Sequence, residues 1–310
     1  MPKKRSFLLG ILLALLLVFS GCAVQNNGGT AKSDAPVTAR TDASKLTVKM
    51  LDVGQGDAIL IESGAQTVLI DTSDLDERDK LKSQLQQAGV KRLDKVLLTH
   101  PHADHIGGMD LLLADFEVGE VYDNGMPSTS KIYIRYMKEL KKQGIKRHGL
   151  KSGEVLDFGN GVLFKVLAPA EELVVKGSEK GYKHDPNNES VVGQLIYGDF
   201  RMMFTGDAER EEENAIISAI GIDSLQSQVL KSGHHGSKTS SSKEWLRAVS
   251  PETALISCGA GNDYGHPHKE TMKKYHAMKL KIFETDKNGT ITLTSDGKGY
   301  EISTEKGGAQ

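Results

Sequence analysis

The sequence has only two cysteines and, beyond its amino-terminal segment, no long apolar run. Two cysteines cannot build the disulfide framework that holds small secreted domains together. If Cys22 is modified, Cys258 remains as a single thiol, and its place after the apolar residues 254–256 favours a small buried side chain at the end of a strand. A disulfide-rich scaffold and a channel of membrane-spanning helices are therefore excluded for this chain.

An excess of positive charge is also missing. The chain has 39 Lys and Arg residues against 41 Asp and Glu residues, a net charge of −2. Removal of residues 1–21, which carry three positive and no negative side chains, would make the net charge −5. No broad basic surface follows from this balance. One local basic run consists of Lys138, Lys141, Lys142, Lys146, Arg147 and Lys151. We expect a solvated helix face there, with contact to a phosphate backbone as the alternative.

The amino-terminal segment has the pattern of a secretory signal peptide. Three basic residues precede an apolar run over residues 7–19, which is shorter than the roughly 20 residues of a permanent membrane helix. Residues 19–22 (FSGC) resemble a bacterial lipobox, with Phe19 where Leu is commoner. That resemblance implies cleavage before Cys22, a lipid on its sulfur, and a tether on the outer face of the cytoplasmic membrane. The alternatives are an ordinary signal peptide and an uncleaved anchor.

The rest of the chain divides into a linker, one domain and a short tail. Residues 22–45 are polar and nearly free of large apolar side chains, so we expect a flexible linker after the lipidated cysteine. Residues 46–303 are enough for one large domain, and residues 304–310 form a tail.

Strand and helix patterns alternate through this domain after an initial meander. We predict strands over residues 46–53, 57–62, 66–71, 95–99, 162–168, 190–197, 200–205, 229–231, 254–257, 281–284 and 290–294. We predict helices near residues 75–88, 109–115, 128–143, 208–220, 243–249 and 267–278, the first capped by Ser73 or Asp74. Residues 171–189 read as a polar loop. This order predicts a mixed-sheet α/β domain. The glycine-rich turn 54–57 lacks the Lys and Ser/Thr of a phosphate loop, which excludes a nucleotide cofactor there.

Residues 100–108, HPHADHIGG, form the densest group of metal-binding residue types in the chain. They lie between a predicted strand and a helical stretch. Alternate residues of extended backbone share a side, so His100 and His102 can bind one ion, while Asp104 and His105, after the turn, can bind another. Four such side chains within six positions argue against an ordinary polar surface loop.

Further potential ligands recur where predicted strands end. They are Asp71, Asp207, His234, His235, His266 and His268. Reactive side chains gather at the carboxyl ends of strands in α/β sheets, so these residues are expected to meet. Two neighbouring divalent ions bound by them could polarise a phosphoryl or carbonyl oxygen. Alternatively, Asp207 caps a helix and His266 is an ordinary loop residue before Pro267.

These motifs resemble those of a known family. HPHADHIGG resembles the HxHxDH motif of the metallo-β-lactamase fold, and residues 205–207 (TGD) resemble its fourth motif. More narrowly, residues 51–58 (LDVGQGDA), 69–72 (LIDT), 188–192 (NESVV), 232–242 (SGHHGSKTSSS) and 257–268 are similar to the extracellular hydrolase-like domain of ComEC competence proteins. The resemblance covers residues 46–296. The long hydrophobic spans of ComEC proteins are absent, and a lipid would replace them as the membrane attachment.

The resemblance implies a four-layer αββα sandwich that binds two divalent metal ions at one edge, between its sheets. His100 and His102 would bind the first metal, Asp104 and His105 the second, and Asp207 would bridge them. Either His235 or His266 would complete the second metal site. One of these two histidines would also assist the departure of the leaving oxygen. Asp71 matches the first-motif aspartate, which orients the cluster without touching metal. Asn188 and Ser190 would support it in the same way.

One departure from the family pattern concerns the third motif. It normally supplies a histidine, but the matching residues here are Asn188-Glu189-Ser190. His184 lies four residues before Asn188 and is one candidate to replace the missing third-motif histidine. A first site with fewer histidines shifts the expected metal a little from zinc towards manganese.

The leading interpretation is a metal-dependent phosphodiesterase or nuclease that acts outside the cell on DNA. Metal-bound hydroxide would be the nucleophile, and Asp104 would hold it in position. One alternative is a cell-surface phosphoesterase that acts on teichoic-acid-type polymers and releases groups such as phosphorylcholine. Another is a catalytically weak module that binds DNA or polymer and assists DNA uptake. The HHGS and DVGQGD motifs argue against true β-lactam hydrolysis.

Overall fold

The computed structural model describes residues 45–310. The predicted signal peptide, Cys22 and all but the last residue of the predicted linker lie outside the described residues. Within residues 45–310, no helix is long and apolar enough to cross a membrane.

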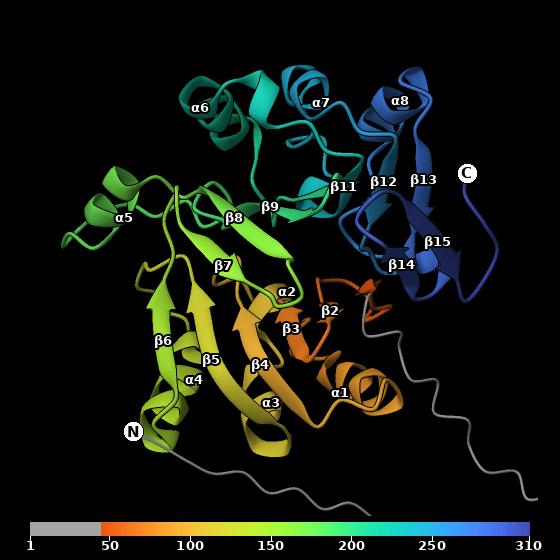
Figure 1. Ribbon diagram of the computed structural model, residues 1–310. Helices are drawn as coiled ribbons and strands as arrows, with labels where there is room; N and C mark the ends of the chain where they lie inside the picture. Colours follow the sequence, from red (N-terminus) through yellow and green to blue (C-terminus); the bar gives the residue numbers. More distant parts are fainter. Residues whose placement is uncertain (1–44) are drawn as a thin grey trace, which may run out of the picture. The chain divides into compact units, whose positions relative to one another are not determined.

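Two mixed β-sheets form the centre of the domain (Figure 1). The eight-stranded sheet has the order β15-β14-β1-β2-β3-β4-β5-β6 and the seven-stranded sheet the order β13-β12-β11-β10-β9-β8-β7. The strands of the first sheet are β1 (Leu46–Met50), β2 (Ile59–Ser63), β3 (Gln66–Ile70), β4 (Arg92–Leu97), β5 (Glu117–Asp123), β6 (Lys146–Gly149), β14 (Ile291–Ser295) and β15 (Tyr300–Thr304). Those of the second are β7 (Val155–Asp157), β8 (Leu163–Ala168), β9 (Val192–Tyr197), β10 (Phe200–Phe204), β11 (Val229–Lys231), β12 (Thr253–Ile256) and β13 (Lys281–Glu284).

Helices cover the outer face of each sheet. The α-helices are α1 (Arg78–Gln87), α2 (Ala103–Ile106), α3 (Met109–Asp115), α4 (Lys131–Gln143), α5 (Glu171–Gly177), α6 (Arg210–Ile220), α7 (Lys243–Val249), α8 (Lys269–Ala277) and α9 (Thr285–Asn288), and two 3₁₀ turns are η1 (Ile222–Ser224) and η2 (Gly233–Gly236). Helices α1, α3 and α4 pack on the first sheet, and α6, α7 and α8 on the second. The predicted four-layer αββα sandwich is confirmed.

Three apolar clusters correspond to the three interfaces between these layers. The cluster between the sheets includes Val48, Ile61, Phe164, Phe204 and Leu255, all nearly inaccessible to solvent. Alternate residues of a strand point to opposite faces, so strands buried on both faces are almost wholly apolar, as β12 (TALI) is. Each such side chain contributes about 1.5–3 kcal/mol when buried.

Parallel pairing brings the site-bearing loops together. In the first sheet β3, β4, β5 and β6 run parallel, and in the second β10, β11, β12 and β13 do so. Their carboxyl ends therefore lie at common edges, and the loops that follow β3, β4, β10, β11 and β12 carry the predicted metal-binding residues.

Several local predictions were wrong. Helix α1 begins at Arg78 after Glu77, with no side-chain cap, because Ser73 adopts a left-handed backbone (φ 61°) and donates its N–H to the Asp57 carbonyl. The predicted loop 171–189 contains helix α5. Strand β15 reaches Thr304, the first residue of the predicted tail, and the Gln310 N–H donates to the Ile282 carbonyl at 3.0 Å. Strands β5, β6, β7 and β15 and the short helix α9 were not predicted.

Candidate metal centre

The loop after β4 presents the first group of ligands. His102 is the N-cap of the short helix α2. Asp104 and His105 therefore lie on a helical turn, whereas His100 lies on the loop before it. His100 Nε2 lies 3.1 Å from His102 Nδ1. The two glycines that follow allow close packing, because a Cβ on Gly107 would lie 2.2 Å from the Leu75 amide nitrogen and one on Gly108 would lie 2.4 Å from the Thr72 carbonyl oxygen.

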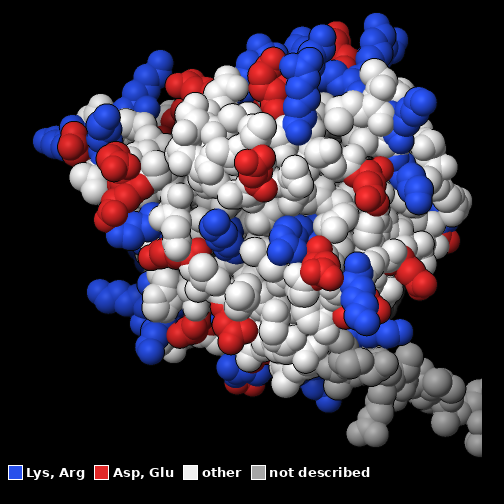
Figure 2. Space-filling model, turned by 45° about the horizontal axis from the view of Figure 1, so that its top comes forward, with Lys and Arg blue, Asp and Glu red and all other residues white. Residues whose placement is uncertain are grey.

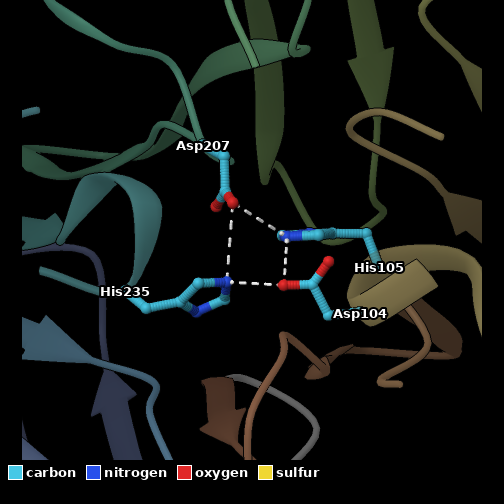
Figure 3. Close-up of side chains that lie close together, drawn as sticks. All are labelled: Asp104, His105, Asp207 and His235. Atoms are coloured by element: carbon cyan, nitrogen blue, oxygen red, sulfur yellow. Dashed lines mark hydrogen bonds and ion pairs between the residues drawn. The ribbon is translucent and has the colours of Figure 1, made fainter. Parts of the chain in front are cut away.

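Asp207, just after β10, contacts His105 and His235, and Asp104 lies on the opposite side of the same two histidines (Figure 3). Its Oδ2 is 3.3 Å from His105 Nε2, 3.5 Å from His235 Nε2 and 3.9 Å from His100 Nε2. The Asp207 N–H donates to Ser190 Oγ at 3.2 Å. Asp207 is not the cap of helix α6, whose N-cap is Glu209. Its position between ligands from both sheets is the one that a bridging carboxylate would need.

His234 and His235 project from a left-handed turn after β11. Both have positive φ, 47° and 52°, which sends two consecutive rings towards the cluster. His235 Nδ1 donates to the Ser257 carbonyl at 2.9 Å, so its Nε2 faces Asp104 Oδ2 at 3.2 Å. His234 Nδ1 contacts Glu209 Oε1 at 3.1 Å, and its Nε2 lies 3.7 Å from Asp207 Oδ2.

Asp71 lies behind His105, on the side away from Asp207. Its carboxylate contacts His105 Nδ1 at 2.8 Å and accepts hydrogen bonds from the Thr99 N–H and hydroxyl at 2.7 and 2.8 Å. A carboxylate on one ring nitrogen fixes the tautomer and leaves the other nitrogen for a metal. Asp71 therefore orients His105.

His266 lines the site but stands one ring further out than His235. The centroids of the two rings are 6.0 Å apart. The Nδ1 of His266 is buried without a hydrogen-bond partner. Burial first, and then the positive charge of His235, lowers the pKa of His266 to about 4. Of the two histidines proposed to complete the second site, His235 is the one in contact with Asp104 and Asp207.

The third-motif region supports the site from outside. Asn188 Oδ1 accepts the N–H groups of Glu209 and Glu212 at 3.1 and 3.3 Å, so it holds the start of helix α6 just after Asp207. His184 contacts the Glu189 carboxylate at 3.0 Å and is not among the residues around Asp207. His234, whose Nε2 lies 3.7 Å from Asp207 Oδ2, is the additional histidine beside the cluster.

A buried ion pair beneath the cluster was missed by the sequence analysis. Lys231, the last residue of β11, is inaccessible to solvent, forms an ion pair with Asp57 and donates to the Gly206 carbonyl at 3.0 Å. Burial alone would lower the pKa of Lys231, but the carboxylates of Asp57 and Asp207 raise it above its usual value. The only available signal was a lysine at the end of an apolar strand, directly before the SGHHGS motif.

The charges of the cluster are strongly coupled. Burial alone would lower the pKa of both His235 and His105. Asp207 and Asp57 nevertheless raise the pKa of His235 to about 10. Asp207 and Asp71 likewise hold the pKa of His105 well above its usual value. The same histidines hold the pKa of Asp207 well below its usual range, against its burial. Burial lowers the pKa of His100 and, less strongly, that of His102.

The donor set fits divalent metal ions. Ligand atoms of Asp104, His105, Asp207 and His235 all lie within 4.8 Å of one another. His105 Nε2 and Asp207 Oδ1 are buried without a hydrogen-bond partner, which is costly unless something else binds there. Imidazole and carboxylate together suit zinc and manganese.

A cavity of about 470 Å³ opens over the cluster. It is lined by Gln55, Asp74, His102, Ala103, Asp104, Asn187, Asp207, His234, His235, Tyr264 and His266. Within residues 45–310, no Lys or Arg is among the lining residues.

On the face that carries the second helix layer, basic and acidic side chains are interspersed and form no continuous basic band (Figure 2). Half of the predicted basic run is paired with carboxylates: Arg147 with Asp123, Lys142 with Glu139 and Lys151 with Glu171.

A four-layer αββα domain with histidines and aspartates gathered at the sheet edge is the arrangement of a metal-dependent hydrolase. The chain belongs to the metallo-beta-lactamase superfamily, since residues 51–260 match that family. Members of this fold usually bind two divalent metal ions. The crystal structure of the metallo-beta-lactamase fold protein YhfI from Bacillus subtilis has the same fold, with a TM-score of 0.54 and 13% identity over 81% of this chain and 100% of that one.

The similar curated proteins confirm the narrower resemblance to ComEC-like competence proteins. ComE operon protein 3 of Bacillus subtilis is 32% identical over 80% of this chain and 33% of its own length. Competence protein ComA of Neisseria gonorrhoeae is 30% identical over 80% of this chain and 32% of its own length. The chain thus spans about a third of the length of these relatives.

Proposed function

We propose that this protein is an extracytoplasmic phosphodiesterase that cleaves DNA, tethered by a lipid on Cys22. The observation that carries the proposal is the central position of Asp207, whose Oδ2 faces His105 and His235 at 3.3 and 3.5 Å. Similarity to competence proteins supports DNA as the substrate class. The signal peptide and lipobox patterns support the location.

Two metal sites would share Asp207. His100, His102 and His234 would hold the first ion, and Asp104, His105 and His235 the second. His234 would then stand in for the histidine that the third motif lacks, and its contact with Glu209 would orient its free nitrogen. This set would give the first site nitrogen ligands, which suit zinc and are compatible with manganese.

The chain's own residues would position the reacting groups. Bound metal ions would supply Lewis acidity towards a phosphoryl oxygen and an activated water. Asp104, held by His235 at 3.2 Å, is placed to orient that water. His266 is neutral at pH 7 because its pKa is about 4, so it can accept a proton or a hydrogen bond from substrate, but it is not an imidazolium acid.

The test uses residues 23–310 loaded with manganese or zinc, with single-stranded DNA, double-stranded DNA and bis-p-nitrophenyl phosphate as substrates. We expect diester cleavage, and a loss of at least about 100-fold in kcat for Asp104→Asn. Absence of turnover of every diester by metal-loaded protein would refute the proposal. Retention of the full-length Cys22→Ser protein in the membrane fraction would refute the lipid tether.

A phosphoesterase of surface polymers is the second candidate. The observation that favours it is the lack of Lys and Arg around the described cavity, because DNA binding usually relies on such side chains. Release of phosphorylcholine or a similar group from teichoic acid, with no cleavage of DNA, would select it. The third interpretation, a weak binding module, rested on the missing third-motif histidine, and the position of His234 weakens that reason.

A further inference from the structure

Tyr264 is an exposed aromatic side chain at the mouth of the metal cavity. It is 66% exposed, the highest value among the large hydrophobic side chains of residues 45–310. Single exposed hydrophobic residues are common, so exposure alone carries no argument. Tyr264 differs from the others because it also lines the cavity over Asp104 and Asp207.

The ring of Tyr264 packs against a neighbouring histidine of the site. It stacks on the His266 ring with centroids 5.6 Å apart and planes 18° apart. Asn262 braces His266 from both sides of its backbone: Oδ1 accepts the His266 N–H at 3.0 Å, and Nδ2 donates to the His266 carbonyl at 2.7 Å. The structure thus provides an exposed aromatic face at the edge of the site, packed on a histidine whose backbone is held by hydrogen bonds.

Three rings form a continuous stack from solvent to the metal centre. Tyr264 stacks on His266, and His266 stacks on His235 at 6.0 Å with planes 28° apart. His235 contacts Asp104 and Asp207 directly. A planar group placed on the outer face of Tyr264 would therefore extend a stack that ends at the reacting centre.

The cavity offers little else that could hold a polymer beside the reacting phosphate. Its described lining has no Lys or Arg, and its charged residues other than histidine are Asp74, Asp104 and Asp207. Phosphates on either side of the reacting one would meet carboxylates there. The favourable contact is with a flat, uncharged group, and in DNA that group is a base.

We infer that Tyr264 is a stacking platform for an unpaired nucleobase next to the phosphodiester that reacts. The inference rests on the proposed phosphodiesterase function and deepens it. Only an unpaired base can present a free face, so the platform selects single-stranded over double-stranded DNA. Stacking on an aromatic side chain tolerates every base, so no strong sequence preference is expected.

The test compares Tyr264→Ala with Tyr264→Phe in manganese-loaded residues 23–310, on a thymidine oligomer and on the same oligomer with abasic positions. We expect Tyr264→Ala to raise KM and Kd for the thymidine oligomer by about 10-fold or more, and Tyr264→Phe to remain within about 2-fold of wild type. The abasic oligomer should bind wild type weakly and be indifferent to either change. Ile222→Ala, which removes an exposed apolar side chain outside the cavity, is the matched control.

Two readouts separate this inference from simpler explanations. Metal content and the affinity for manganese must be unchanged in Tyr264→Ala; a loss of metal would mean that Tyr264 only supports His266 and would overturn the inference. Equal Kd values for wild type and Tyr264→Ala on the thymidine oligomer would also overturn it. If wild type cleaves no diester, the proposed function fails, whereas Kd from fluorescence anisotropy still tests the platform.

Discussion

The two carboxylate oxygens of Asp207 have different neighbours. Oδ2 faces the imidazoles of His105 and His235, whereas Oδ1 lies 3.9 Å from the ammonium of Lys231. Lys231 also pairs with Asp57, whose Oδ1 is 3.5 Å from His235 Nδ1. This buried lysine therefore places a positive charge between the carboxylates of Asp57 and Asp207 behind the cluster.

Replacement of Lys231 by Met should destabilise the protein and weaken metal binding. Asp57 would lose its lysine partner in a buried position, at a cost of about 3–5 kcal/mol in the free energy of unfolding, measured with urea. Metal affinity, measured by calorimetry, should fall about 10–100-fold, as for other residues that orient ligands. The double variant Lys231→Met, Asp57→Asn should recover much of the stability. Unchanged metal affinity in a folded single variant would contradict this role.

Metal binding at neutral pH should release protons. The pKa of His235 is raised to about 10 and that of His105 is raised well above its usual value, so both rings are protonated at pH 7 without metal. Their nitrogens must lose a proton to bind an ion, so affinity should rise as pH increases from 6 to 8. Calorimetry in buffers of different ionisation enthalpy measures the protons released. A value of zero at pH 7 would show that these rings do not bind metal.

At this scale, spacing along the chain predicted part of the site. The position of Asp207 and the later histidines at the ends of predicted strands indicated that they would meet, and Asp207 does contact His235. The division of residues 100–105 into two pairs of metal ligands stays a prediction. The choice of His235 over His266, and the role of His234, could not be predicted, since both depend on positive φ angles in the turn after β11. Lys231 and Asp57 meet only through the packing of separate sheets.

Helix α6 follows directly from the loop that carries Asp207. Its first turn holds three acidic residues, Glu211, Glu212 and Glu213, which suits the positive end of a helix. Glu213 accepts the N–H groups of Ser241 and Ser242 at 2.6 and 2.9 Å, so the helix is joined to the loop that follows the histidine turn. Glu212 is also buried. Among residues 45–310, its carboxyl group forms neither a hydrogen bond nor an ion pair.

Glu212→Gln should stabilise the protein above neutral pH. Burial, and then Glu211, raises the pKa of Glu212 to about 7 from an ordinary 4.5. Because the folded-state pKa is raised, the folded state favours the neutral carboxyl, and stability falls as pH rises from 4.5 through 7. At pH 8 the gain should be on the order of 2–3 kcal/mol, with almost none at pH 4. Urea unfolding at both pH values measures it. An equal gain in the exposed variant Glu211→Gln would point to net charge instead.

Most elements could be predicted because their burial is one-sided or complete. Strands β8, β10, β12 and β13 are apolar runs, and helix α4 has a Ser130 cap and an apolar face. Strands β6 and β7 are short and largely exposed, so no alternation of apolar and polar residues marks them. Strand β15 is only half-buried at a sheet edge, and its polar sequence has no apolar run that would predict a strand.

The metal centre connects the two halves of the sandwich. Asp104 and His105 follow β4 of the eight-stranded sheet, whereas Asp207 and His235 follow β10 and β11 of the seven-stranded sheet. Ions bound among them would cross-link the two sheets, so metal binding and global stability should be coupled.

Removal of metal should therefore lower Tm. Binding at a free concentration of 100 Kd stabilises a folded protein by about 2.7 kcal/mol, which corresponds to roughly 5–10 °C for a domain of this size. Differential scanning calorimetry of metal-loaded and chelator-treated protein measures the change. In Asp207→Asn, which removes the shared carboxylate, the difference should shrink by more than half. A Tm independent of metal would mean that the ions do not join the sheets.

The core between the sheets has a consequence for which residues can change. Gly193 in β9 leaves room for the Phe164 ring, and a Cβ at that position would lie 2.2 Å from the ring. A larger residue would displace Phe164 within the apolar cluster between the two sheets that carry the metal-binding residues, although neither Gly193 nor Phe164 lines the cavity. The volume of side chains deep in the core is thus limited by the distances that the metal centre requires. A substitution that enlarges one core side chain should be tolerated only with a second substitution that makes a neighbour smaller.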